Sequence, residues 1–170
     1  RKCEKARHYF RLLGDTLRVA NTLLKSGTTY TSFDTERGVK ELVQSAKLYL
    51  MAGDSTSHFS ALQGIARAAI IDSNYRKAIE IDRQIIKKMP GFKRSDNCYY
   101  DLCYAYSGLG MADSAKLFFS KTNPNPTDKQ QLSTRYWSES ALAYVNKDFE
   151  RYHRLDRLRR VINDSIFNNK

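Results

Sequence analysis

The three histidines are the side chains best suited to metal binding or to proton transfer, and their spacing favours neither. His8, His58 and His153 lie in three well-separated segments, and none has a second histidine or a cysteine at a metal-ligand spacing. We therefore interpret each of them as a polar residue at the surface or between helices.

Phosphate-binding and nucleophile motifs are incomplete. Gly108-Leu109-Gly110 lacks the further Gly, the Lys and the Ser/Thr of a phosphate-binding loop, so we interpret it as a helix end. Asp113-Ser114 and Asp164-Ser165 have no histidine placed to activate the hydroxyl. The sequence predicts no catalytic residue, no metal site and no cofactor.

The cysteines do not form a recognisable framework. Cys98 and Cys103 are five residues apart in one helical segment, which suits neither a disulfide nor the spacing of zinc ligands, and Cys3 stands alone. We expect Cys103 to be buried on a packing face and chemically inert.

The chain carries a formal net charge of +11, spread over several segments. A scattered surplus of Lys and Arg favours a solvated helical surface, while an anionic partner such as nucleic acid is the alternative. The same two interpretations apply to the last predicted helix, 149–167. There a solvated helix is favoured over a contact surface for anionic partners. Its arginines are Arg151, Arg154, Arg157, Arg159 and Arg160.

Apolar and small residues recur at three-and-four spacing along most of the chain, which is the pattern of amphipathic helices. We predict an all-α protein in which the only β-leaning stretch is the short run 28–32. Apolar runs such as 68–71 are short, and no apolar run exceeds five residues, far below the roughly 20 residues of a membrane span. The predicted helices are 2–13, 16–32, 35–52, 56–72, 75–89, 95–109, 112–122, 128–146 and 149–167.

A repeat of 37 residues links the later helices. Ala78, Ala115 and Tyr152 are 37 residues apart, each early in a helix that follows a short polar turn. A sustained period of this length indicates stacked helical hairpins. We expect Ala78 and Ala115 to lie where two helices cross closely.

A second short pattern occurs twice in the first third of the chain. Ala6-x-x-Tyr9 runs into Gly14-Asp15, and Ala46-x-x-Tyr49 runs into Gly53-Asp54. Both read as the end of one helix, a left-handed turn residue and a capping residue for the next helix. The first helix would then be the second half of a hairpin, so we expect the chain to be part of a longer protein.

The segment with Leu62, Ala66, Ala69, Tyr75, Ala78 and Pro90 resembles one tetratricopeptide repeat. A second unit contains Tyr99, Leu102, Cys103, Tyr106, Ala115 and Phe119. The resemblance implies a right-handed superhelical stack of antiparallel hairpins forming a single domain over 1–170, an α-solenoid. After the first helix, the four pairs would span 16–52, 56–89, 95–122 and 128–167.

Two short phrases, 111–115 and 164–166, resemble bacterial membrane-anchored regulators whose repeats lie outside the inner membrane. This resemblance implies a sensory or scaffolding region on the periplasmic side, with any membrane contact made by other parts of the parent protein. A cytoplasmic location is the alternative, and self-association of the chain is left open.

The tetratricopeptide resemblance also implies that the first helix of each pair lines a concave binding face. The residues that the spacing places there are Gln63, Arg67, Asn97, Tyr100, Tyr104, Trp137, Ala141 and Tyr144. Aromatic rings with one Arg and amides are typical of protein-binding hot spots. We expect a protein or peptide segment as partner, although Trp137 and Tyr100 could instead fill gaps between hairpins.

Overall fold

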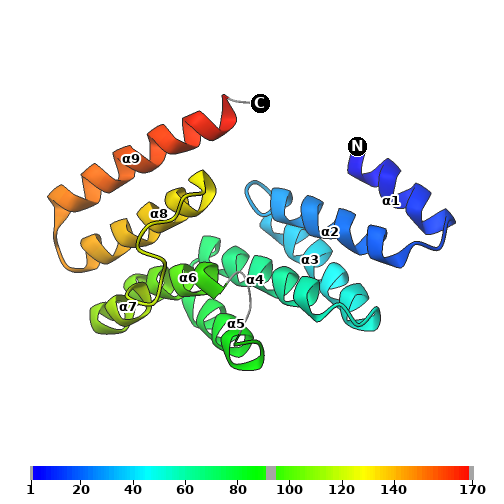
Figure 1. Ribbon diagram of the computed structural model, residues 1–170, viewed down its shortest axis with the longest axis horizontal. Helices are drawn as coiled ribbons and strands as arrows, with labels where there is room; N and C mark the ends of the chain where they lie inside the picture. Colours follow the sequence, from blue (N-terminus) through cyan, green and yellow to red (C-terminus); the bar gives the residue numbers. More distant parts are fainter. Residues whose placement is uncertain (1, 91–94, 169–170) are drawn as a thin grey trace. The chain divides into compact units, whose positions relative to one another are not determined.

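The computed structural model describes residues 2–90 and 95–168, and this part of the chain is helical and contains no strand. Each helix begins and ends within three residues of the bounds predicted from the sequence, so the all-α prediction is confirmed (Figure 1). The described helices are α1 (Lys2–Leu12), α2 (Thr16–Tyr30), α3 (Thr35–Met51), α4 (Ser55–Ile71), α5 (Tyr75–Lys88), α6 (Ser95–Gly108), α7 (Ala112–Phe119), α8 (Lys129–Val145) and α9 (Phe149–Phe167).

Five of the turns between these helices are built in the same way. One residue of each turn has a positive φ, between 58° and 74°, and these residues are Gly14, Gly53, Ser73, Gly110 and Lys147. Its amide donates to the carbonyl three residues earlier, as Gly53 N does to Leu50 O at 3.1 Å. Ser73, Gly110 and Lys147 are 37 residues apart, so the repeat read from the sequence is present in the local backbone.

The residue that follows the positive-φ residue caps the next helix. Asp15, Asp54, Asn74 and Asp148 each accept a hydrogen bond from the backbone amide three residues later, at 2.9–3.3 Å. At the fourth turn this place is taken by Met111, which makes no side-chain cap. A left-handed residue and a capping oxygen together satisfy the amides and carbonyls that a helix end leaves without partners.

The chain divides into two compact units, Arg1–Lys77 and Ala78–Lys170. In the first unit α2 packs on α1 and α3, and α3 also packs on α4. In the second unit α6 packs on α7 and α8, and α8 packs on α9 (Figure 1). Helices that follow one another in the sequence are thus neighbours within each unit, while a superhelical stack of the whole chain stays a prediction.

In the first unit α2 and α3 cross so closely that only glycine fits. A Cβ atom added to Gly38 would lie 2.7 Å from the backbone nitrogen of Thr31 and 2.9 Å from the carbonyl oxygen of Gly27. The buried Leu42 fills the space beside this crossing and also reaches Gly64 of α4. The close approach of Gly38 to Gly27 and Thr31 sets the distance between α2 and α3.

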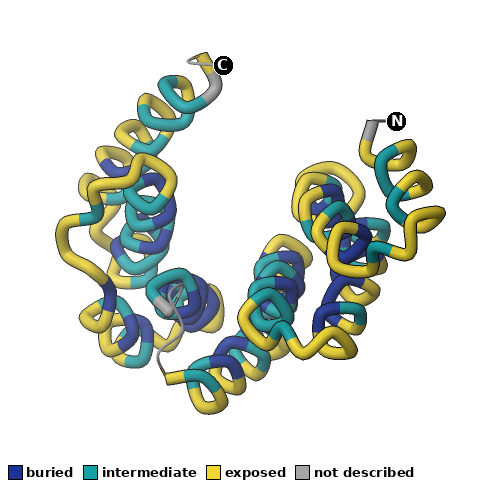
Figure 2. Tube along the Cα trace, turned by 45° about the vertical axis from the view of Figure 1, so that its right-hand side comes forward, coloured by how far each residue is buried: buried dark blue, intermediate teal, exposed yellow. Residues whose placement is uncertain are grey.

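The core of the second unit lies among α5, α6 and α7. Leu102, Cys103, Tyr106, Ala115 and Phe118 form its buried cluster, and the rings of Tyr106 and Phe118 stack with their centroids 5.3 Å apart. Figure 2 shows such buried residues along the sides of helices that face other helices. Ala78 and Ala115 are both fully buried, which agrees with their predicted place between helices, while a close crossing at either residue stays a prediction.

We predict that Gly38→Ala destabilises the protein by about 1–3 kcal/mol, because the new methyl group meets backbone atoms that cannot move independently. The matched control is Gly64→Ala, whose Cβ would meet only the Leu42 side chain at 3.1 Å. This contact is longer than those at Gly38 and involves a side chain instead of the backbone, and Ala is favoured over Gly in a helix by about 1 kcal/mol, so we expect a smaller loss. Urea unfolding of both variants measures the difference, and a Gly38→Ala variant at least as stable as Gly64→Ala would contradict the close crossing.

We also predict that Ala115→Leu costs about 1–3 kcal/mol, because Ala115 is fully buried in this cluster and a larger side chain would overpack it. Lys116→Leu, at the exposed neighbouring position, should leave the melting temperature nearly unchanged. Thermal unfolding followed by circular dichroism measures both variants. Equal melting temperatures for the two variants would show that Ala115 does not lie on the packing face.

Candidate functional site: an aromatic surface on two helices of the second unit

Aromatic rings from α6 and α8 meet at the surface of the second unit. The rings of Tyr104 on α6 and Trp137 on α8 stack with their centroids 3.9 Å apart and their planes 19° apart. Both side chains are partly exposed. Trp137, Ala141 and Tyr144 are four and three residues apart, so they share one side of α8. We call Tyr104, Trp137, Ala141 and Tyr144 the aromatic surface.

Tyr144 is the most solvent-exposed residue of the aromatic surface. Its side chain is 59% exposed. The ring contacts Phe149 and Tyr152 edge-on, with centroid distances of 5.8 and 5.5 Å. These contacts come from the start of α9, so the α8–α9 hairpin holds the ring in place while leaving much of it in solvent.

Small buried side chains beneath the aromatic surface hold α6 and α8 together. The Ser138 hydroxyl donates to the carbonyl of Tyr100 at 2.9 Å, and the Cys103 thiol donates to the carbonyl of Ser138 at 3.6 Å. Burial raises the pKa of the Cys103 thiol to about 12, so almost no thiolate is present at neutral pH. Cys103 is therefore a packing residue of this interface, as the sequence predicted.

The structure corrects the predicted position of Tyr100. Its side chain is only 1% exposed, and its hydroxyl donates to the carbonyl of Asn123 at 3.2 Å. Arg135 donates to the same carbonyl at 3.0 Å. The connection between α7 and α8 therefore covers Tyr100, so its predicted place on a binding face is wrong, and the buried ring agrees with the alternative that it fills a gap between helices.

The predicted position of Gln63 is wrong for a related reason. Its side chain is buried on α4, a helix that buries residues around much of its circumference: Ala61, Gln63, Ile65, Ala66, Ala68, Ala69 and Ile70. Arg67 and Asn97 are partly exposed. Arg67 lies on α4 of the first unit and is therefore not part of the aromatic surface, which belongs to the second unit.

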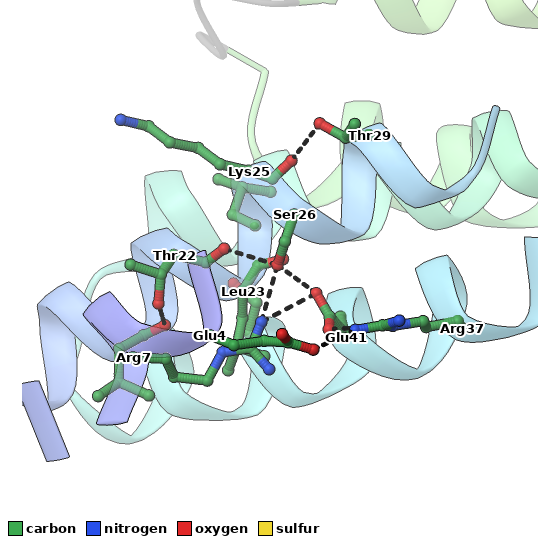
Figure 3. A network of polar contacts seen from close by, with 12 residues as sticks. Glu4, Arg7, Thr22, Leu23, Lys25, Ser26, Thr29, Arg37 and Glu41 are labelled. Atoms are coloured by element: carbon green, nitrogen blue, oxygen red, sulfur yellow. Dashed lines mark hydrogen bonds and ion pairs between the residues drawn. The ribbon is translucent and has the colours of Figure 1, made fainter. Parts of the chain in front are cut away.

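Sequence reasoning missed a buried polar network in the first unit (Figure 3). The Ser26 hydroxyl of α2 donates to the Glu41 carboxylate of α3, and Arg7 of α1 lies 3.1 Å from the same carboxylate. Arg37 continues the network by donating to Glu4 at 2.8 Å. No sequence motif connects these residues, because they meet only when three helices pack.

This network contains a hydroxyl beside a carboxylate, but its chemistry is structural. Ser26 is 5% exposed, and the Arg7 and Glu41 side chains are 13% and 10% exposed, so a substrate has little access to the hydroxyl. A buried carboxylate with an arginine partner avoids the large cost of an uncompensated charge. We therefore interpret the network as the contact that fixes α1 to α2 and α3.

The described residues 2–90 and 95–168 hold no group of three His, Cys, Asp or Glu side chains that could bind a metal ion. In this part of the chain no helix is both long and apolar enough to cross a membrane. His58 Nδ1 lies 2.9 Å from the carbonyl of Ala46, which places this histidine between α3 and α4, whereas His8 and His153 are exposed.

Comparison with models of known protein families and with curated proteins yields no match to this chain.

The burial of these rings predicts how truncation affects stability. Tyr100→Ala should lower the free energy of unfolding by about 3–5 kcal/mol, the usual cost of removing a buried aromatic ring. Tyr144→Ala should cost less than about 1 kcal/mol, because most of that ring is already in solvent. Urea unfolding measures both, and Tyr100→Phe is the control that keeps the packing and removes one hydrogen bond. Similar losses for Tyr100→Ala and Tyr144→Ala would mean that the two rings are not buried differently.

Proposed function

We propose that this protein binds a segment of another protein through the aromatic surface of its second unit. The observation that carries the proposal is the partly exposed Tyr104–Trp137 stack, with Tyr144 on the same side of α8. Trp and Tyr are the residues most enriched in binding hot spots. Rings already held in place by stacking lose little conformational entropy when a partner covers them.

The composition of the aromatic surface supports binding in preference to catalysis. It consists of three rings and one methyl group, and it contains no histidine, carboxylate or cysteine. Such a surface offers apolar area and two phenol hydroxyls, which suit an apolar or aromatic segment. Because the surface itself carries no charge, the affinity should depend only weakly on salt concentration.

The alternative function, binding of nucleic acid by the basic surface, makes the opposite prediction. Contacts to phosphates release counterions, so the affinity of a nucleic-acid binder falls steeply as salt concentration rises. The net charge of +11 is what favours this alternative. Retention of duplex DNA at low salt and its loss at physiological salt would support it.

We further propose that the protein is a sensory or scaffolding region on the periplasmic side of a bacterial membrane-anchored regulator. Support comes from the two phrases at 111–115 and 164–166, which resemble that class. The complete reading frame of the parent gene tests this proposal. A membrane span and an output domain are expected there, and a frame with neither would contradict it.

The binding proposal is tested by selecting peptides from a random display library on the whole chain. We predict that Trp137→Ala and Tyr144→Ala in the protein each weaken the binding of the selected peptides by about 2 kcal/mol or more, roughly 30-fold. The matched control is Phe33→Ala, which removes an exposed aromatic ring from the first unit. Fluorescence anisotropy with labelled peptides measures the affinities.

Two results would contradict the aromatic surface as the binding site. One is that the selected peptides bind Trp137→Ala and Tyr144→Ala as tightly as the original protein. The other is that Phe33→Ala weakens binding as much as they do. Circular dichroism of each variant separates lost binding from lost folding.

A further inference from the structure

Helix α9 carries five arginines, and three of them pair with carboxylates. Arg151 lies 2.6 Å from Glu139 of α8. Arg159 and Arg160 lie 3.0 and 2.7 Å from Asp156. The hydrogen bond from Arg159 lowers the pKa of Asp156, so this carboxylate stays charged at neutral pH. Each of these three arginines therefore has a carboxylate partner, although Arg159 and Arg160 share Asp156.

The other two arginines, Arg154 and Arg157, are exposed, and no carboxylate of the described chain pairs with either of them. They lie next to Leu158 and Val161, which are 42% and 62% exposed. Residues 154, 157, 158 and 161 have the spacing i, i+3, i+4 and i+7, so all four share one side of α9. We call this set the α9 stripe.

The same spacing marks a packed helix face elsewhere in this protein. On α3 the residues 42, 45, 46 and 49 are all buried. There Leu42 fits against glycines of α2 and α4, and the Ser45 hydroxyl donates to the carbonyl of Ala20 at 2.8 Å. α9 packs on α8 through its opposite side, where Leu155 is buried. The α9 stripe thus has the geometry of a helix contact, with two exposed aliphatic side chains and two arginines.

Charge identifies what could cover the stripe. A second copy of this chain would carry the same net charge of +11 and the same two arginines on its own stripe, so charge repulsion opposes self-association through this face. A phosphate backbone would gain nothing from the apolar side chains of Leu158 and Val161. A protein helix with aliphatic and acidic residues complements both parts of the stripe.

We propose that the α9 stripe binds an acidic amphipathic helix of another protein. In this contact, aliphatic side chains of the partner cover Leu158 and Val161, and its carboxylates pair with Arg154 and Arg157. The proposal is independent of the aromatic surface, because the two sites use different residues.

The test uses a synthetic helical peptide of about 20 residues, long enough for a helix to form, with Leu at i and i+3 and Glu at i+4 and i+7 on one face. Binding to the whole chain is followed by fluorescence anisotropy at about 0.15 M salt. We expect the double variant Arg154→Glu, Arg157→Glu to weaken binding by at least about tenfold. A peptide with Lys in place of Glu should then bind this double variant more tightly than it binds the original protein.

The matched control is the double variant Lys116→Glu, Lys129→Glu, which changes the net charge equally at exposed positions on α7 and α8. It should bind the acidic peptide nearly as well as the original protein. Leu158→Ser with Val161→Ser should also weaken binding, and a peptide with Ser in place of Leu should bind poorly. Trp137→Ala should leave the acidic peptide bound, so failure of one proposal can be told from failure of the other.

Several results would overturn the proposal. One is that the original protein binds the acidic peptide no better than the Ser-substituted peptide, which would leave only non-specific charge attraction. Another is an equal loss of binding in both double charge variants. A third is that duplex DNA or phosphatidylserine vesicles bind through Arg154 and Arg157 while the acidic peptide does not.

Discussion

The arrangement of this protein depends on one local constraint, the left-handed residue that ends a helix immediately before the cap of the next. Five turns place a positive-φ residue at this point, and at four of them the next side chain caps the following helix. Only Gly adopts this conformation without steric cost, and Ser73 and Lys147 adopt it at about 1 kcal/mol or more. Because the turn allows so few residues, successive helices reverse direction and must pack on one another.

Close packing of neighbouring helices decides which side chains are small. Gly27 and Gly38 allow α2 and α3 to touch, and Ser138 allows α8 to approach α6 closely enough for its hydroxyl to reach a backbone carbonyl. Larger side chains are confined to the gaps beside these contacts or to the open sides of the helices. The Tyr104–Trp137 stack arises in this way, since two rings on adjacent helices meet where the helix axes are held close.

The second unit consequently presents two surfaces of different chemistry. The aromatic surface on α6 and α8 is uncharged, so an interaction there depends on apolar area and shape. The α9 stripe combines aliphatic groups with two arginines that have no carboxylate partner in the described chain, so an interaction there needs complementary charge. The arginines of α9 thus differ in their surroundings: Arg151, Arg159 and Arg160 have a carboxylate within ion-pair distance, and Arg154 and Arg157 have none in the described chain.

The sequence alone determined the helix bounds, the positions of the turns and the burial of Ala78 and Ala115, because each depends on interactions within a few residues or on a repeating pattern. It also placed Tyr104, Trp137, Ala141 and Tyr144 on helix sides that remain at least partly exposed. Only the tertiary structure decided that Tyr100 is covered, since the covering carbonyl of Asn123 comes from a connection 23 residues away. The Arg7–Glu41 ion pair likewise joins residues 34 positions apart, on α1 and α3, which meet only when the helices pack. Spacing along one helix reports which residues share a side, but only packing between helices determines whether that side is covered.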